Sequence, residues 1–177
     1  STSEVYGKST DVPFQEDADL VMGPTVKHRW AYACSKAIDE FLALAYWKET
    51  RQPVIVMRFF NTVGPRQTGQ YGMVVPTFVS QALRGLPLPV HGDGTQTRSF
   101  MYIDDCLKGI DMIMHSDIVE PINLGSNELV TINELVDIVE AIGGIKLKRT
   151  YDLSAPKGVN GRNSDNTMIQ KLLGWEP

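Results

Sequence analysis

A tyrosine and a lysine stand four residues apart in the segment Tyr32-Ala-Cys-Ser-Lys36. In a helix this spacing puts both side chains on one face. Tyrosine, with a reference pKa of about 10, is a poor base at neutral pH, but a nearby ammonium favours the phenolate. Such a phenolate can take a proton from an alcohol while hydride leaves the same carbon. The alternative is that both side chains lie on a solvated helix face, because the pattern is short and common.

A second group of polar side chains lies about 30 residues upstream, where Thr2, Ser3 and Glu4 fall within an expected strand stub over residues 1–6. Ligands of open α/β folds bind at the carboxyl ends of strands. These side chains are therefore candidates to meet the same ligand as Tyr32. The structural alternatives are a Thr2 hydroxyl bonded to the backbone and a Glu4 carboxylate that is simply solvated.

The elements that must position these residues alternate between helix and strand. Residues 25–50 contain no Gly or Pro and carry apolar residues at helical spacing, which predicts a long helix. Residues 53–60 form a continuous apolar run, typical of a parallel strand buried on both faces. Further helices are expected over 74–83, 103–114, after the capping box 131–134 and near 168–172, and further strands over 88–91, 122–124 and 147–151. The fold class is therefore α/β.

Apolar stripes and small residues predict which side chains of these elements are buried. We expect the stripes of two helices to face inward, namely Ile103, Leu107, Ile110 and Met114 in the first and Ile132, Leu135, Val139 and Ile142 in the second. Cys34 and Cys106 are interpreted as small buried residues.

Composition limits the classes of protein to which the chain can belong. With 17 Lys and Arg against 21 Asp and Glu, the net charge of −4 argues against a nucleic-acid binder. The hydrophobic content of 42% excludes disorder. No apolar run is long enough to span a bilayer and no signal peptide is recognisable, so a cytoplasmic protein fits best. Two cysteines and three scattered histidines offer neither a disulfide framework nor a metal site.

Six stretches carry a family resemblance: residues 1–7, 32–36, 58–65, 92–98, 104–105 and 174–177. In this order they resemble the extended short-chain dehydrogenase/reductases that modify nucleotide sugars. The resemblance implies NAD as cofactor. It also implies the C-terminal part of a doubly wound Rossmann-type parallel sheet in residues 1–64. Residues 65–177 would then form a small α/β substrate-binding domain, with some segments returning to the Rossmann sheet.

The resemblance implies roles for the polar residues described above. Tyr32 is expected to be the catalytic base, and Lys36 is expected to bind the nicotinamide ribose. Thr2 is expected to share a hydrogen bond with the sugar hydroxyl that is oxidised. Ser3 and Glu4 occupy the positions where related enzymes place a second acid/base group.

Further residues are implied to contact the cofactor and the nucleotide sugar. Phe59 is expected at the cofactor. Arg98 and Arg162 match two diphosphate-binding arginines, whose planar fork suits phosphate oxygens. Asn61 matches a substrate-binding asparagine, and Val90 belongs to a segment that encloses the nucleotide base. The structural alternatives are surface arginines, a capping asparagine and a core valine.

One part of the family pattern is absent from the chain. The glycine-rich dinucleotide turn is missing, because Gly92-Asp-Gly94 lacks the third glycine and follows no βα start. We therefore expect this chain to be the C-terminal half to two-thirds of an enzyme whose first Rossmann strands precede it. The sequence does not distinguish NAD from NADP.

The family chemistry is a transient oxidation at C4 of the sugar. Residues 1–7 are similar to those of UDP-glucuronate decarboxylases and some 4,6-dehydratases, although Ser3 replaces an aspartate of the dTDP-glucose dehydratases. Residues 158–165 resemble GDP-mannose 3,5-epimerases, whose catalytic cysteine is Glu4 here. Epimerisation at C4 of a UDP-sugar needs only the tyrosine, the hydroxyl and room for the sugar to turn over. It is therefore slightly favoured over decarboxylation or dehydration.

Two other classes of function stay open. The first is a catalytically inert module that binds nucleotide sugars, and the second is a reductase of small carbonyl compounds, which would not need Arg98 and Arg162. The resemblance also implies a homodimer that pairs through the helix of Tyr32 and the helix before it, which is not in this sequence.

Overall fold

The computed structural model describes residues 1–69, 73–155 and 161–177, and these residues divide into two compact units. Unit 1 contains Ser1–Thr62, Ser99–Glu128 and Arg162–Pro177. Unit 2 contains Val63–Arg98 and Leu129–Gly161. Part of the segment 158–165 lies outside the described residues.

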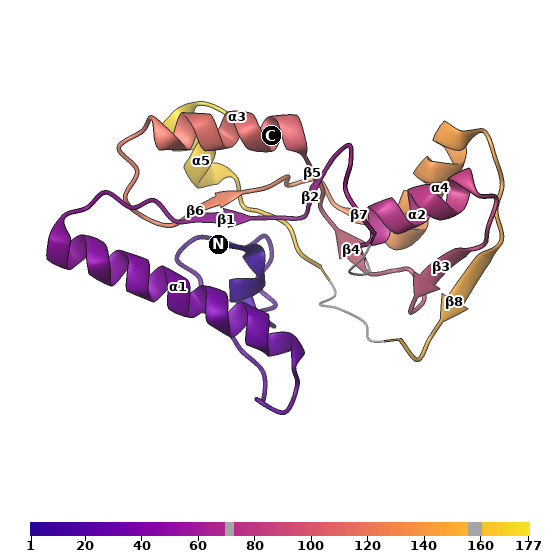
Figure 1. Ribbon diagram of the computed structural model, residues 1–177, viewed down its shortest axis with the longest axis horizontal. Helices are drawn as coiled ribbons and strands as arrows, with labels where there is room; N and C mark the ends of the chain where they lie inside the picture. The colour runs from indigo at the N-terminus through magenta and orange to yellow at the C-terminus, as the bar shows by residue number, and fades with distance from the viewer. Residues whose placement is uncertain (70–72, 156–160) are drawn as a thin grey trace. The chain divides into compact units, whose positions relative to one another are not determined.

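Unit 1 is organised around two parallel strands, β1 (Met57–Phe59) and β6 (Ile122–Leu124) (Figure 1). Their register pairs the central residues Arg58 and Asn123. Because side chains alternate along a strand, these two residues point to one side and their neighbours to the other. Met57, Phe59, Ile122 and Leu124 accordingly belong to one apolar cluster.

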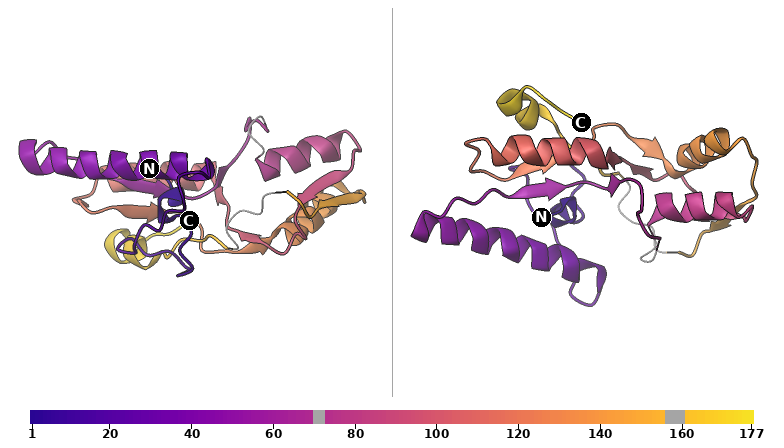
Figure 2. Two further views of the ribbon diagram at one scale, coloured as in Figure 1. Left: turned by 90° about the horizontal axis from the view of Figure 1, so that it is seen from below. Right: turned by 45° about the horizontal axis from the view of Figure 1, so that its top comes forward.

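The helices of unit 1 cover the two faces of this strand pair. One cluster unites β6 with α3 (Ile103–Met114), α5 (Thr167–Leu173) and the short strand β5 (Met101–Tyr102). The other unites Ala37 of α1 (Arg29–Thr50) with Val5 and Tyr6 of the 3₁₀ helix η1 (Ser3–Tyr6). Figure 1 and the right panel of Figure 2 show α3 and α1 on opposite sides of the strands. The carboxyl end of β1 thus lies in the same unit as η1 and α1.

Unit 2 also combines helices with strand pairs. Strand β3 (Leu88–His91) runs parallel to β8 (Arg149–Asp152), and β4 (Thr97–Arg98) runs antiparallel to β7 (Val130–Thr131). Helices α2 (Val74–Leu83) and α4 (Ile132–Gly143) pack on each other and on β3. The strand β2 (Thr62–Val63) begins where the chain leaves unit 1.

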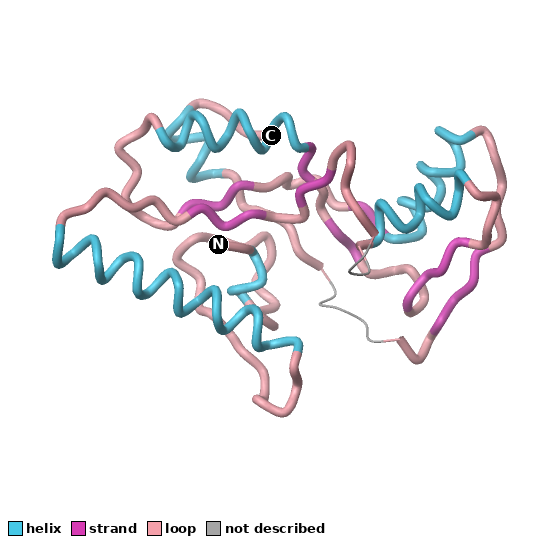
Figure 3. Tube along the Cα trace, in the orientation of Figure 1, coloured by secondary structure: helices cyan, strands magenta, loops and turns pink. Residues whose placement is uncertain are grey.

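The α/β class is confirmed, with three differences in the elements near the candidate site. The expected stub over residues 1–6 is a 3₁₀ helix, because the Thr2 hydroxyl accepts from the Glu4 N–H and the Thr2 carbonyl accepts from the Val5 N–H. Only a β-bridge between Thr2 and Phe59 remains of the strand. The long helix begins at residue 29 rather than 25 (Figure 3). The strand expected over 53–60 shrinks to 57–59, since its partner β6 has three residues.

Several expected core positions are exposed instead. In α3 the buried positions are Cys106, Gly109 and Ile113, because Leu124 and Trp175 pack against Gly109. Side chains that we expected to face inward but that are exposed are Leu107, Met114 and Ile142. Cys34 is also exposed, whereas Cys106 is buried as expected. In α3 the expected stripe therefore gave the right helix but a face rotated from the one that is buried. In α4, by contrast, Ile132 and Leu135 are buried as expected.

Candidate active site

Helix α1 carries Tyr32 and Lys36 on adjacent turns, as the sequence predicts. The phenol is accessible, because Tyr32 is 54% exposed, and the Lys36 side chain is 36% exposed. Lys36 Nζ lies 2.8 Å from Asp39 Oδ2. This hydrogen bond and the charge of Asp39 raise the pKa of Lys36, and the Tyr32 phenol adds a smaller contribution. Lys36 therefore stays an ammonium beside the phenol at neutral pH.

Thr2 stands at the carboxyl end of β1 through its bridge to Phe59. Its hydroxyl oxygen accepts from the Glu4 N–H at 3.3 Å and so caps η1. This is the structural alternative considered for Thr2. The hydroxyl hydrogen remains available to donate to another oxygen. In the part of the chain that the structure describes, no hydrogen bond joins Thr2 to Tyr32.

Glu4 and Arg162, far apart in the sequence, form an ion pair with Nη1 to Oε1 at 3.0 Å. Arg162 is only 2% exposed, and its Nη2 lies 3.5 Å from the Gly7 carbonyl oxygen. Glu4 keeps a side-chain exposure of 39%, whereas Ser3 is buried. Glu4 is therefore held in unit 1 as a paired, partly exposed carboxylate.

Two further residues of unit 1 that are expected to bind ligands, Asn61 and Phe59, contact other parts of the same unit. The Asn61 amide nitrogen donates to the Ser99 carbonyl at 2.9 Å, which fixes the side chain just beyond β1. Phe59 is partly buried and packs against the apolar cluster that contains α3. The contacts seen for both residues are those of well-packed strand-end positions.

Val90 and Arg98 belong to unit 2. Val90 lies in β3 and is fully buried, so the core-packing alternative describes its surroundings. Arg98 ends β4, and its Nη1 donates to the Thr97 carbonyl at 2.6 Å. The structure thus places eight candidates in unit 1, namely Thr2, Ser3, Glu4, Tyr32, Lys36, Phe59, Asn61 and Arg162. Val90 and Arg98 lie in unit 2.

Asp39, Glu40 and Arg58 were not anticipated from the sequence. The i,i+3 spacing of Lys36 and Asp39 is a signal that could have identified the first pair. Glu40 is buried among the apolar positions of α1 and pairs with Arg58 of β1. A charged residue in an otherwise apolar stripe is the signal that marks this second pair.

Two further properties concern the described residues alone. Among them, no group of three or more His, Cys, Asp or Glu side chains could hold a metal ion. None of the helices within these ranges is both long and apolar enough to cross a bilayer.

Comparison with known proteins supplies the family. The sequence matches the family described as GDP-mannose 4,6 dehydratase over residues 1–177. The chain belongs to this family. It is 42% identical to a UDP-N-acetyl-alpha-D-glucosaminuronate decarboxylase of Bacillus cytotoxicus, covering all of this chain and 57% of that protein. It is 37% identical to UDP-glucuronic acid decarboxylase 1 of Danio rerio, covering all of this chain and 42% of that protein.

Several solved structures are similar to the whole of this chain. A UDP-glucuronic acid 4-epimerase from Bacillus cereus, in complex with UDP-glucuronic acid and NAD, superposes with a TM-score of 0.87 at 30% identity. A dTDP-glucose 4,6-dehydratase from Bacillus anthracis, in complex with NAD, gives 0.86 at 30% identity. Each match covers 100% of this chain and 55% of the solved one. The chain therefore spans about half the length of the proteins that it matches, and the family resemblance seen in the sequence is confirmed.

Proposed function

We propose that the whole protein catalyses an NAD-dependent conversion of a UDP-linked uronic acid that begins with oxidation at C4. The observation that carries this proposal is a substrate class shared across two activities. The curated relatives are named as decarboxylases of UDP-glucuronic acid and of its N-acetylated amino analogue, and a similar solved structure is a 4-epimerase holding UDP-glucuronic acid and NAD.

The residues of α1 fit the ribose and nicotinamide end of the cofactor. An accessible phenol and an ammonium on adjacent turns can together hold ribose hydroxyls and meet a sugar hydroxyl. NAD, when bound, accepts the hydride of the sugar C4 and returns it later. Tyr32 takes the proton of the C4 hydroxyl. Thr2 donates its hydroxyl hydrogen to the sugar oxygen and orients it.

Decarboxylation follows from a ketone at C4 of a uronic acid. The carboxylate C6 is attached to C5, so it lies β to the ketone, and the electrons of the broken C5–C6 bond can enter the carbonyl as an enolate. C5 of the enolate then takes up a proton from water, and CO₂ is the leaving molecule. The names of the two curated relatives favour this course.

Epimerisation at C4 is the second candidate. It needs only the base, the hydroxyl and space for the sugar to turn over, and the 4-epimerase structure supports it. The residues alone slightly favour epimerisation, but the relatives support decarboxylation equally well.

The reaction products distinguish decarboxylation from epimerisation at C4. We expect the whole protein, incubated with NAD and UDP-glucuronic acid, to release CO₂ and to give a UDP-pentose that has lost the mass of CO₂. A product of unchanged mass with inverted C4 would instead establish epimerisation. Recovery of unaltered substrate, with UDP bound, would contradict both and leave the inert binding module.

The diphosphate of the substrate is assigned to the two arginines expected from the sequence. Arg98 offers its guanidinium at the end of β4. We propose that the Arg162 guanidinium, which pairs with Glu4, also contacts a phosphate oxygen. Replacing both with alanine should raise KM for UDP-glucuronic acid about tenfold or more. Unchanged turnover in this variant would favour a reductase of small carbonyl compounds.

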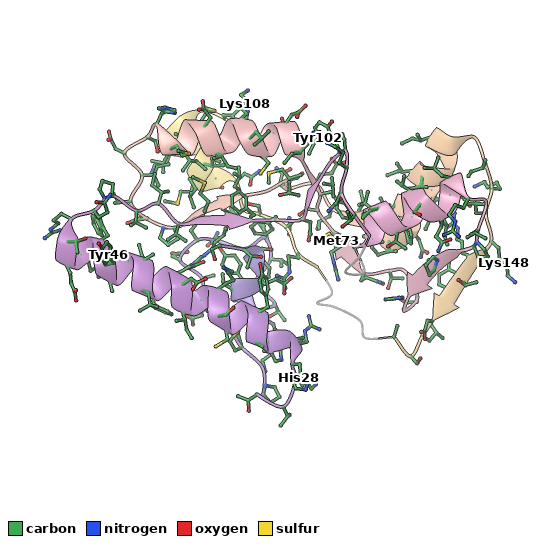
Figure 4. All side chains as sticks on the ribbon, in the orientation of Figure 1. His28, Tyr46, Met73, Tyr102, Lys108 and Lys148 are labelled. Atoms are coloured by element: carbon green, nitrogen blue, oxygen red, sulfur yellow. The ribbon has the colours of Figure 1, made fainter. Side chains whose placement is uncertain are left out.

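A homodimer through α1 is proposed as the assembly. Four large apolar residues of α1, namely Ile38, Phe41, Leu42 and Tyr46, are more than half exposed, and Figure 4 shows Tyr46 on this helix. Exposed apolar patches of this kind mark interaction surfaces. Sedimentation of the whole protein should give a dimer that the variant Phe41→Glu converts to a monomer. A wild-type monomer at micromolar concentration would contradict this assembly.

A further inference from the structure

A buried ion pair lies one helical turn beyond Lys36. Arg58 Nη2 is 2.8 Å from Glu40 Oε2, and Arg58 Nε lies 3.1 and 3.2 Å from the two carboxylate oxygens. Both residues are almost fully buried. Burial alone would lower the pKa of Arg58, but the bonds with Glu40 and Tyr6 outweigh it and raise the pKa, so Arg58 stays charged. The pair therefore joins α1 to the centre of β1 by directional, charge-assisted bonds.

The same two side chains reach the other elements that carry candidate site residues. The Ser1 hydroxyl, next to Thr2, donates to Glu40. Arg58 Nη1 donates to the Tyr6 hydroxyl at 3.0 Å, at the end of the helix that contains Ser3 and Glu4. The Tyr6 hydroxyl in turn donates to Asn123 Oδ1 of β6 at 2.7 Å. Each segment that bears a candidate catalytic residue thus has a neighbour in this network.

Stability alone does not explain the pair. Removing two charges from water costs several kcal/mol per ion, and apolar replacements of such pairs are often neutral or stabilising. The effect of the pair on the position of α1 along its axis is separate from its effect on stability. Beside Glu40, the buried face of α1 consists of Trp30, Ala33 and Ala37. Ala33 and Ala37 are small and alike, so they give little resistance to a slide of the helix along its axis, while Trp30 packs on Gly23 of the preceding loop. Glu40 is the buried position of α1 that is held by directional bonds.

We propose that the Glu40–Arg58 pair is a positioning device that fixes α1 along its axis, so that the Tyr32 phenol is held at the reacting sugar hydroxyl. This inference rests on the proposed function of Tyr32 as the base. A slide of one residue would move the phenol by about 1.5 Å. A misplacement of about 1 Å can cost 10²-fold in rate. Glu40 and Arg58 are thus positioning residues, because they act through α1 and β1.

Two matched single variants separate an effect on the position of α1 from an effect on folding. Glu140 of α4 is a second buried carboxylate paired with an arginine, 2.9 Å from Arg149, but it lies in unit 2. We expect Glu40→Gln to lower kcat of the whole protein at least about tenfold while KM for UDP-glucuronic acid stays within about threefold. Glu140→Gln should lower the melting temperature without a comparable loss of kcat.

A double variant keeps the test valid if a single one fails to fold. Glu40→Leu with Arg58→Met removes both charges, so no unpaired charge is buried, and its melting temperature should stay close to that of the wild type. Its kcat should nevertheless fall about 10²-fold. The crystal structure of this variant should show α1 displaced along its axis relative to β1, a readout that does not depend on turnover.

The outcomes are distinct. A double variant with wild-type kcat and an unmoved α1, in a protein whose Tyr32→Phe variant is inactive, overturns the positioning role and leaves the proposed function intact. A wild-type protein that oxidises no UDP-sugar overturns the proposed function and this inference with it. Equal losses of kcat in Glu40→Gln and Glu140→Gln would also contradict the inference, because they would show a general effect of burying an amide.

Discussion

Lys36 and Glu4 each hold a partner of opposite charge in unit 1, and neither pairing was expected from the sequence. Asp39 keeps Lys36 charged, and Arg162 keeps Glu4 paired. The polar residues near Tyr32 therefore have defined local contacts as well as proposed chemical roles. Substitutions at this scale must be chosen so that the loss of a contact and the loss of a chemical group can be told apart.

Thr2 illustrates this point, because its hydroxyl caps η1 and is also proposed to orient the sugar hydroxyl. We expect Thr2→Val to destabilise the protein by about 1 kcal/mol, the usual cost of a lost cap. Its kcat should fall about 10²-fold, more than the lost stability explains. Urea unfolding and steady-state kinetics measure the two effects. Thr2→Ser keeps the hydroxyl and should restore both, whereas Thr2→Val with normal kcat would contradict the proposed role.

The bounds of several helices and strands are determined by the local sequence. Helix α2, strand β3 and strand β6 have the bounds expected from sequence, because Gly and Pro bracket short apolar runs there. The capping box at Thr131 also begins α4 as expected, since its two hydrogen bonds are local. By contrast, which face of α3 is buried depends on distant partners. Its spacing alone could not reveal that Trp175 packs on Gly109.

Gly109 gives a prediction whose sign depends on this packing. Within a helix, Gly→Ala normally stabilises by about 1 kcal/mol. Here a Cβ would lie 2.5 Å from Leu124 Cδ1 and 2.9 Å from Trp175 Cζ3. Overpacking of this kind costs about 1–3 kcal/mol, so we expect Gly109→Ala to be destabilising by urea unfolding.

Gly143 provides the control, because the nearest atom to its Cβ would be Ile145 Cγ1 at 3.2 Å, on a side chain that can move. Gly143→Ala should stay within about 0.5 kcal/mol of the wild type. Gly109→Ala at or above wild-type stability would show that α3 does not pack closely on β6 and Trp175.

Glu140 makes the stability of unit 2 depend on pH. Hydrogen bonds from Lys146, the Leu147 N–H and Arg149 lower the pKa of Glu140 from 4.5 to about 2. A carboxylate with a lowered pKa in the folded state stabilises it above the unfolded value, and this contribution is lost as pH falls. Urea unfolding should therefore show Glu140→Gln less stable than the wild type near neutral pH, with the difference shrinking between pH 4.5 and about 2.

A companion variant tests the cause. Lys146 is the largest contributor to this shift, so Lys146→Met should raise the pKa of Glu140 and move the acid loss of stability to higher pH. If the difference in free energy of unfolding between the wild type and Glu140→Gln does not change with pH, this ion pair is ruled out as a source of acid sensitivity.

For the whole molecule, the class and the family could be predicted from motifs in chain order, while the contacts that hold the site together could not. Tyr32 and Lys36 were found because their spacing is local. Glu40 pairs with Arg58 and Glu4 with Arg162 through the tertiary fold, and no spacing rule links either pair. The match to relatives covers about half of their length, so the activity is a property to be measured on the whole protein.

The most direct test is the absorbance of reduced cofactor when UDP-glucuronic acid is mixed with the whole protein and NAD. The account predicts a transient signal in the wild type, because the C4 hydroxyl is oxidised first and the hydride is returned later. It predicts no such signal in Tyr32→Phe, which lacks the base but can still bind both ligands. A transient of wild-type size in Tyr32→Phe would contradict the proposed role of this tyrosine.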